Sequence, residues 1–476
     1  MKQTPSDPEL VAESAAESGP YAGGRSITIP WGPEGSLELR LPAGGLIALT
    51  DVDIVSPDLS DPLNDYPGAL ERALESPMGS DRLEQHLTPG ARVAIIVDDP
   101  SRWTPVREAL PIILRRLHRA GIRDDDVTIS VGVGRHRAVD AEAMRRRVGD
   151  SIAARHRCFS PPVDDRSAYV DLGLTRQGVP VRVFRPVAQA DLRILVGSVL
   201  PHLQAGFGGG YKLIFPGTSH RSTLGSLHHQ GLGAQSDAAG LLGGDAASNP
   251  MRQAIYEAAS KLGPCWSISH LIGRLGQVFR VIAGHPEPVQ DLLAAEARKR
   301  FCAPAAPAAD LIVAGNDPWP GDPMQSFKVL LHHRTACRAG GVLVGLFWTD
   351  PAEIDRSFPI GTLRSIAATR ALGGWTIRRF LPVAERAAAA AGSPVAFMLR
   401  WARELVVDRR VLVYAPPLYE RVGPRLGPVQ LFGNQAALWH AAAAAFGQDS
   451  RARPAGRLRL RLFPHGGLTY AQGHGS

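Results

Sequence analysis

Short apolar runs that each lead into polar residues and then into an amphipathic segment are the pattern that most constrains the fold of this chain. Residues 92–97 (RVAIIV), 127–133 and 192–199 form such runs in the first half, and residues 311–314 and 341–347 repeat the pattern in the second half. Runs of this kind are typical of parallel strands, because parallel sheets are covered by helices on both faces. The sequence therefore predicts an α/β fold.

The segments between these runs carry helix signals. Thr104 followed by Pro105 is an N-cap and first-turn pair that predicts a helix, and Asp140 is a cap for a second helix rich in arginine. A further helix is predicted over residues 324–338. Near the N-terminus, alternating apolar and polar residues within 26–41 predict a β-hairpin.

Each of the first three apolar runs ends in polar residues that can take part in chemistry. Asp99 and Arg102 follow the first run, His136 follows the second, and His202 follows the third. The carboxyl ends of parallel strands lie at one edge of a sheet, and open α/β sheets bind their ligands at that edge. We therefore expect these four side chains to gather in one site, although each alone is compatible with an ordinary turn or surface residue.

A glycine-rich stretch, residues 206–210, leads almost directly into Lys212. It is not a Walker A loop, which needs lysine directly after glycine and then serine or threonine, because Tyr211 and Leu213 flank the lysine here. The chain has 53 lysine and arginine residues but only five lysines. Arginine is thus the default cation, and a lysine at this place indicates a need for an amine that can lose its proton and act as a nucleophile.

Composition limits the classes of function. The four cysteines form no CxxC pair, which argues against a thiolate zinc site, so any metal would be held by histidine, carboxylate or a cofactor. The formal charge of +8 comes from dispersed arginines without interleaved aromatic residues, which favours small anionic substrates over nucleic acid. No apolar run approaches the ~20 residues of a membrane span, and we expect a cytoplasmic protein.

At 476 residues the chain is long enough for two or three domains. We expect a flexible leader over residues 1–25, an α/β domain over 26–287 and a second α/β domain over 288–476, with the active-site cleft between the two domains. Whether the last apolar run, residues 458–463, stays in the second domain or returns to the first is left open by the pattern.

Several of these segments resemble the nickel-pincer nucleotide-dependent lactate racemase family. Residues 98–105 (DDPSRWTP), 134–137 (GRHR) and 201–217 (PHLQAGFGGGYKLIFPG) are similar to three signature segments of that family and occur in the same order. His228 follows Lys212 at the separation found in the family. With weaker similarities further on, the resemblance covers roughly residues 26–350.

The resemblance implies a cofactor, pyridinium-3,5-bisthiocarboxylic acid mononucleotide nickel, whose synthesis needs dedicated partner enzymes. It implies that Lys212 carries the cofactor covalently through a thioamide and that His228 is the fourth nickel ligand. The expected cofactor contacts are completed by Gly208, Gly209, Gly210 and Asp99.

The resemblance also implies the groups that act on the substrate. His136 and His202 correspond to paired acid/base residues, and Arg102, Gln325 and Lys328 to groups that hold the substrate carboxylate. Together they imply a racemase or epimerase in which the hydrogen on C2 of a 2-hydroxy acid leaves as hydride and returns to either face.

The chain departs from the family pattern at positions expected near the substrate. Trp103 replaces a proline, Arg135 replaces a threonine, and Met324 stands where the family often has tyrosine. The expected substrate is therefore a 2-hydroxy acid that need not be lactate.

Other interpretations remain open at this stage. The chain is also compatible with an oxidoreductase that releases a keto acid, or with a non-catalytic homologue that binds a nucleotide or an anion. His229 is interpreted as solvated, but it becomes the metal ligand if the alignment shifts by one residue. His332 and His333 are interpreted as helix-surface residues.

Overall fold

The computed structural model describes residues 13–15, 25–42, 47, 49–134, 136, 138–233, 241–319, 321–357, 373–391, 393, 396–407, 409–447 and 458–472. These residues form two compact units. The central unit is Asp61–Arg300, and the terminal unit combines the two ends of the chain, Met1–Ser60 and Phe301–Ser476. Both units are α/β, as the sequence predicts. The predicted leader over residues 1–25 lies almost entirely outside the described residues.

The predicted boundary at residues 26 and 287 is wrong. The hairpin of β2 (Arg25–Trp31) and β3 (Gly35–Arg40) packs into the same apolar core as the strands after residue 300. The strand β4 (Leu49–Ile54) pairs in parallel with β20 (Leu458–Phe463), so the last strand stays in the terminal unit and does not return to the other one. Short runs predict strands well, but they do not reveal which distant strand each one pairs with.

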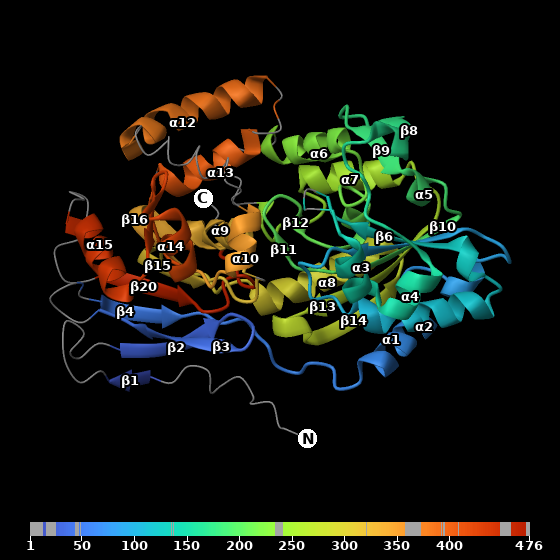
Figure 1. Ribbon diagram of the computed structural model, residues 1–476, viewed down its shortest axis with the longest axis horizontal. Coiled ribbons are helices and arrows are strands. Elements are labelled where there is room, and N and C mark those ends of the chain that lie inside the picture. Colours follow the sequence, from blue (N-terminus) through green and yellow to red (C-terminus); the bar gives the residue numbers. More distant parts are fainter. Residues whose placement is uncertain are drawn as a thin grey trace. The chain divides into compact units, whose positions relative to one another are not determined.

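A six-stranded sheet with the order β14-β13-β10-β5-β6-β7 is the frame of the central unit (Figure 1). All neighbours are parallel except β13 and β14. In chain order the strands are β5 (Val93–Asp98), β6 (Val127–Gly132), β7 (Arg157–Phe159), β10 (Leu192–Ser198), β13 (Cys265–Ile272) and β14 (Val278–Gly284).

Both faces of this sheet are covered, which explains why its strands read as continuous apolar runs. In β5, Val93, Ile95 and Val97 point into one buried cluster, whereas Ala94 and Ile96 point into another. Helices α1 (Tyr66–Glu75), α2 (Val106–Arg119), α3 (Ala141–Val148) and α4 (Asp150–Arg155) contribute to the first cluster, and α5 (Arg185–Ala188), α6 (Arg221–Gly233) and α7 (Pro250–Ala259) to the second. Helix α8 (Pro286–Phe301) ends the unit, and the hairpins β8 (Tyr169–Leu174) with β9 (Pro180–Phe184) and β11 (Pro201–His202) with β12 (Gly206–Phe207) lie outside the sheet.

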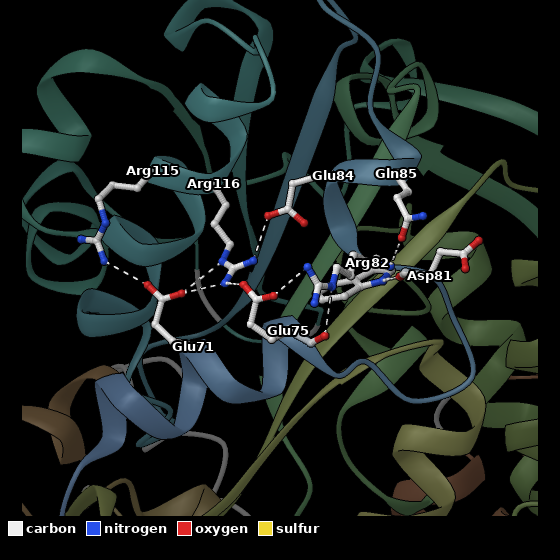
Figure 2. Close-up of polar contacts among 9 residues, drawn as sticks. Glu71, Glu75, Asp81, Arg82, Glu84, Gln85, Arg115 and Arg116 are labelled. Atoms are coloured by element: carbon white, nitrogen blue, oxygen red, sulfur yellow. Dashed lines mark hydrogen bonds and ion pairs between the residues drawn. The ribbon is translucent and has the colours of Figure 1, made fainter.

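A buried arginine joins helices α1 and α2 on the first face. The side chain of Arg116, only 8% exposed, donates to Glu71 and Glu84 at 2.9 Å each and also to Glu75 (Figure 2). Arg115 contacts the same Glu71 from the exposed side at 3.3 Å. Because one guanidinium has five donors, a single buried cation satisfies three carboxylates from two elements.

The terminal unit is built on a seven-stranded sheet with the order β18-β19-β17-β16-β15-β20-β4, parallel except between β18 and β19. Its other strands are β15 (Ala309–Gly315), β16 (Cys337–Leu346), β17 (Arg410–Tyr414), β18 (Arg425–Leu426) and β19 (Val429–Phe432), and a separate sheet combines β1 (Glu13–Ala15) with β2 and β3. The helices are α9 (Pro323–His333), α10 (Pro351–Ser357), α12 (Gly373–Ala390), α13 (Ala396–Val406), α14 (Pro416–Val422) and α15 (Gln435–Gly447). Among the described residues, no helix combines the length and apolar character needed to cross a membrane.

Of the two helix-end predictions, the one for Asp140 is confirmed and the one for Thr104 is wrong. Asp140 does cap α3, since its Oδ1 accepts from the backbone N–H of Ala143 at 2.8 Å. Thr104 does not cap α2; the cap position is Pro105, and the Thr104 hydroxyl donates to Asp98 at 2.5 Å instead. The Thr104 hydroxyl thus holds the loop to Asp98 and makes no capping hydrogen bond to α2.

The interpretation of His332 and His333 as surface residues is wrong. Their exposed fractions are 2% and 0%, and burial lowers the pKa of both to about 3. His333 is held by the Val329 carbonyl at 2.9 Å and by the Thr469 hydroxyl at 3.0 Å. The segment after β20 covers this face of α9, which the local sequence does not indicate.

Candidate functional site

Three neighbouring parallel strands bring the predicted residues of the central unit to one sheet edge. Strands β10, β5 and β6 are adjacent in the sheet. His202 follows the carboxyl end of β10, Asp99 that of β5 and His136 that of β6. The chain runs outward from β5 through β6 on one side and continues through β10 and β13 on the other. The reversal of strand order lies between β5 and β10, which is where open α/β sheets bind ligands. The prediction that these three strands end at one sheet edge is confirmed, whereas the gathering of Asp99, Arg102, His136 and His202 in one site stays a prediction.

Asp98 is the buried anchor of the loop that follows β5. Its carboxylate pairs with Arg147 of α3, accepts from Thr104 at 2.5 Å and lies 3.4 Å from the Ser198 hydroxyl. Burial raises the pKa of Asp98, while the charge of Arg147 and the hydrogen bond from Thr104 oppose that rise. Asp98 is thus fully occupied by protein groups, and the neighbouring Asp99 is the carboxylate that faces the site.

Arg147 holds the backbone of the same loop. Its guanidinium donates to the carbonyls of Asp98 at 3.0 Å, Arg102 at 3.0 Å and Thr104 at 3.1 Å. The sequence shows Arg147 only as one of several arginines on a helix, so its role could not be read from the pattern. Its effect is to fix the loop that presents Asp99 and Arg102.

Asp99 and His136 form a hydrogen-bonded pair. Nδ1 of His136 lies 3.0 Å from Oδ2 of Asp99, and the two side chains are 28% and 10% exposed. Burial alone would raise the pKa of Asp99, but the charge and hydrogen bond of His136, with help from Arg102, lower it below its ordinary value. Because Nδ1 donates its proton to the carboxylate, neutral His136 carries a lone pair on Nε2, the arrangement that makes a histidine a proton acceptor.

His202 has the opposite tautomer. Its Nδ1 accepts from the backbone N–H of Ala205 at 3.1 Å and from that of Gln204 at 3.3 Å. The proton of the neutral ring is therefore on Nε2, so His202 offers a donor where His136 offers an acceptor. In their neutral forms, the two histidines at this edge carry their protons on different ring nitrogens.

The glycine-rich stretch turns tightly because it packs against the protein itself. Gly206, Gly209 and Gly210 have positive φ values of 73°, 78° and 57°. A Cβ would lie 2.6 Å from the Gly244 carbonyl at Gly206 and 2.9 Å from the Ser198 carbonyl at Gly209. The glycines are therefore required by backbone conformation and close packing, and Lys212 follows them in a short 3-10 turn, Gly210–Leu213.

His228 lies on α6 with one ring nitrogen fixed. Nδ1 donates to the Leu224 carbonyl at 2.7 Å, which leaves the lone pair of the neutral ring on Nε2. A hydrogen bond of this kind orients an imidazole for metal ligation. The side chain of Gln204 also donates to the His228 carbonyl at 3.1 Å, which ties the helix to the loop after β10. Nδ1 of the neighbouring His229 is buried without a hydrogen-bond partner among the described residues.

The residues expected to hold the substrate carboxylate are divided between the two units. Arg102 belongs to the central unit, whereas Gln325 and Lys328 lie on α9 of the terminal unit, where Lys328 Nζ donates to Gln325 Oε1 at 2.6 Å. The prediction that all three serve one cleft between the domains stays a prediction.

The terminal unit also contains a polar pair that the sequence did not reveal. Asp317 follows β15 and His465 follows the neighbouring strand β20, and their Oδ2 and Nδ1 atoms are 2.6 Å apart in a buried environment. In the sequence, the only indication of this pair is that each residue follows the carboxyl end of an apolar run. Among the described residues, no group of three or more histidine, cysteine, aspartate or glutamate side chains is arranged to hold a metal ion.

Replacing Arg147 by Met tests the role of the buried pair. Asp98 would lose the charge that offsets its burial, and losing one partner of a buried ion pair costs about 3–5 kcal/mol. The pKa of Asp98 would rise further, so the folded variant would bind a proton that the unfolded chain releases. The stability deficit should therefore be smaller at pH 5 than at pH 8, as measured by denaturant unfolding. Arg145→Met, an exposed position on the same helix, is the control; an equal deficit in both variants would contradict the assignment.

Comparisons with known proteins point to one family. Residues 44–240 match the family model described as the lactate racemase N-terminal domain. The chain is 26% identical to the lactate racemase of Thermoanaerobacterium thermosaccharolyticum over 278 residues, which are 58% of this chain and 64% of that protein. It is 32% identical to the lactate racemase of Lactiplantibacillus plantarum over 159 residues, 33% of this chain and 37% of that protein. The matched segments thus span less than two thirds of either relative.

Solved structures share the fold. The lactate racemase apoprotein from Thermoanaerobacterium thermosaccharolyticum superimposes with a TM-score of 0.74 at 18% sequence identity, covering 94% of this chain and 99% of that one. A protein from Thermotoga maritima gives a TM-score of 0.54 at 13% identity, covering 85% and 97%. With the family-model match and the two sequence relatives, the chain is similar in sequence to lactate racemases and shares the fold of a lactate racemase apoprotein.

Proposed function

We propose that this protein is an isomerase, a racemase or epimerase of a 2-hydroxy acid, that acts in the cytoplasm. The observation that carries the proposal is the pair of histidines with opposite tautomers, His136 and His202, which follow two strands on either side of β5. Inverting a hydroxyl-bearing carbon needs one group that accepts a proton and one that gives a proton, in either order. The similarity to lactate racemases supports the same reaction class.

The protein groups fit the nickel-pincer nucleotide that the family resemblance implies. His228 offers one imidazole nitrogen, oriented by the Leu224 carbonyl, and imidazole is a suitable ligand for nickel. Lys212, half-buried after the glycine-rich stretch, offers an amine for covalent attachment. When bound, the cofactor would supply the hydride chemistry that amino-acid side chains cannot perform.

The acid/base residues would act on the substrate hydroxyl. Nε2 of His136 accepts the hydroxyl proton of one enantiomer, and Asp99 keeps the ring oriented through Nδ1. His202, whose neutral ring carries its proton on Nε2, would donate a hydrogen bond to the same oxygen. It gives up a proton only from its doubly protonated form and accepts one at Nε2 only after its proton has moved to Nδ1, so the exchange of roles between the two histidines needs proton exchange with solvent.

The positive residues would recognise the carboxylate. Arg102 on the loop held by Arg147, together with Lys328 and its partner Gln325, are the proposed groups. A guanidinium binds a carboxylate with two parallel hydrogen bonds and an ammonium adds a compact charge. Trp103, next to Arg102 and 37% exposed, offers an apolar surface where the family has proline, so the side group of the substrate need not be the methyl of lactate.

The first test is the attachment of the cofactor to Lys212. Protein produced together with the cofactor-synthesising enzymes should carry a nucleotide-sized mass increase on the peptide that contains Lys212, measured by peptide mass mapping. Lys212→Arg should carry none, because a guanidinium does not form the amide-type bond under these conditions. An unmodified Lys212 in an active, nickel-containing preparation would remove the attachment from the proposal.

The second test compares two neighbouring histidines. His228→Ala should lower the nickel content of holo-protein at least several-fold, because outer- and inner-sphere changes at metal sites cost about 10–100-fold in affinity. His229→Ala is the matched control and should leave nickel content near that of the unaltered protein, measured by elemental analysis. If His229→Ala lost nickel and His228→Ala kept it, the ligand assignment would be shifted by one residue.

The third test concerns the paired acid/base residues. His136→Ala and His202→Ala should each lower kcat for racemisation by about 10²–10⁴-fold in both directions, because a closed cycle needs both groups. The measurement is chiral chromatography of a panel of 2-hydroxy acids, started from each enantiomer. Accumulation of a keto acid by the unaltered enzyme would favour the oxidoreductase alternative, and near-normal rates in both variants would exclude the two-histidine scheme. His440→Ala, on an exposed helix face, is the control.

A further inference from the structure

Two buried side chains hold the carbonyl oxygens of the glycine-rich stretch. Arg252 of α7, 1% exposed, donates to the carbonyls of Ala205 at 3.1 Å and Gly209 at 3.5 Å, and also to that of Phe207. Gln290 of α8, 3% exposed, donates from Nε2 to the Gly208 carbonyl at 2.8 Å. Four carbonyls within five residues are thus satisfied by two side chains from two separate helices.

The charge of Arg252 is difficult to explain as simple packing. Among the described ion pairs none involves Arg252, and burial lowers its pKa, with only the nearby Tyr256 and Asp291 opposing that shift. Placing a cation in the interior without a contacting carboxylate is costly unless hydrogen bonds to backbone dipoles offset the loss of water. A methionine of similar length would fill the space, so the guanidinium indicates a requirement for its donors.

The loop needs those donors because of its backbone conformation. Gly206, Gly209 and Gly210 adopt positive φ, which turns the intervening peptide groups so that their carbonyls face α7 and α8. A buried carbonyl without a partner costs about 1–3 kcal/mol. The Gly209 carbonyl also accepts from the backbone N–H of Lys212 at 3.2 Å. One oxygen therefore connects Arg252 directly to the backbone of the lysine.

We propose that Arg252, assisted by Gln290, is a positioning residue for Lys212. It fixes the turn through the carbonyls of residues 205–209, so that the lysine amine is presented in one place relative to the end of β10. The inference rests on the proposed function only in assigning Lys212 the role of cofactor attachment. The positioning of Lys212 by Arg252 can be tested in protein without cofactor.

A neighbouring arginine shows that the arrangement is specific. Arg298 of α8 lines the same cavity of about 230 Å³ as Arg252 and Gln290. It donates to the Gly243 carbonyl at 3.1 Å and to Asp245 at 2.7 Å, and among the described residues it forms no hydrogen bond with the carbonyls of residues 205–210. Proximity to the cavity therefore does not by itself place a cation on the glycine-rich stretch.

The experiment uses cofactor-free protein of full length and two readouts. Hydrogen exchange followed by mass spectrometry reports the opening of residues 205–212, and acetic anhydride labelling reports the accessibility of the Lys212 amine relative to that of the exposed Lys261. Arg252→Met should raise exchange in this segment by about tenfold or more and change the ratio of Lys212 to Lys261 labelling, because several hydrogen bonds are lost together. Arg252→Lys, which keeps one charge but not the fork of donors, should restore only part of the protection.

Arg193→Met is the matched control. Arg193 is also buried, 2% exposed, and donates to four backbone carbonyls, those of Val187, Ala188, Ala190 and Pro264, at the opposite end of β10. Because Arg193 supports a different part of the fold, Arg193→Met should lower the midpoint temperature of thermal unfolding without changing hydrogen exchange in residues 205–212. Equal exchange in both variants, or unchanged exchange in Arg252→Met, would overturn the proposal.

A third variant decides the question if Arg252→Met does not fold. Gln290→Leu keeps the volume of the side chain and removes the single bond to Gly208, so exchange at residues 208–212 should rise about threefold or more. Unchanged exchange in a folded Gln290→Leu protein would overturn the proposal. These readouts need no cofactor, so a failure here is distinct from an absence of racemase activity in the unaltered holo-protein.

Discussion

The buried ion pair between Asp98 and Arg147 determines how the edge of the central sheet is built. Asp98 is the last residue of β5, and its carboxylate draws together α3 through Arg147, the following loop through Thr104 and the neighbouring strand through Ser198. Because Arg147 also donates to three carbonyls of that loop, the pair leaves the loop little freedom. Asp99 can then pair with His136, which follows β6, while Asp98 and Arg147 hold the loop after β5 in place.

Buried arginine that donates to backbone carbonyls recurs in this unit, at Arg147, Arg193 and Arg252. Guanidinium suits this use because it stays charged and presents five donors in one plane, whereas an ammonium is strongly hydrated and loses its proton more readily when buried. The composition of the chain follows from the same physics. Arginine supplies the structural cations, and lysine is kept at few positions, one of which follows the glycine-rich stretch.

Local patterns predicted the elements of the fold but not the way distant segments combine. The apolar runs at β5, β6 and β10 and the shared edge after them could be predicted, because a parallel strand covered on both faces has a recognisable composition. The pairing of β4 with β20, which moves the N-terminal residues into the terminal unit, depends on contacts some 400 residues apart that no local signal records. Likewise the motif residues Asp99 and His136 were identified, but Arg147, Arg252 and Gln290 were not, because a supporting arginine or glutamine on a helix looks like any solvated one.

The opposite tautomers of the two histidines bear on how a racemase of this design can work. On the proposed function, neutral His136 can accept a proton at Nε2 while His202 presents an Nε2–H donor, so the resting site is suited to one enantiomer, and action on the mirror image requires the protons on the two rings to be redistributed first. For a pair of enantiomers the equilibrium constant is one, so kcat/KM must be equal in the two directions whatever the asymmetry of the site. Any difference in kcat between the two directions must therefore be matched by the same ratio in KM. On the proposed function, the hydrogen bonds to Nδ1 of each histidine set which enantiomer has the higher values of both.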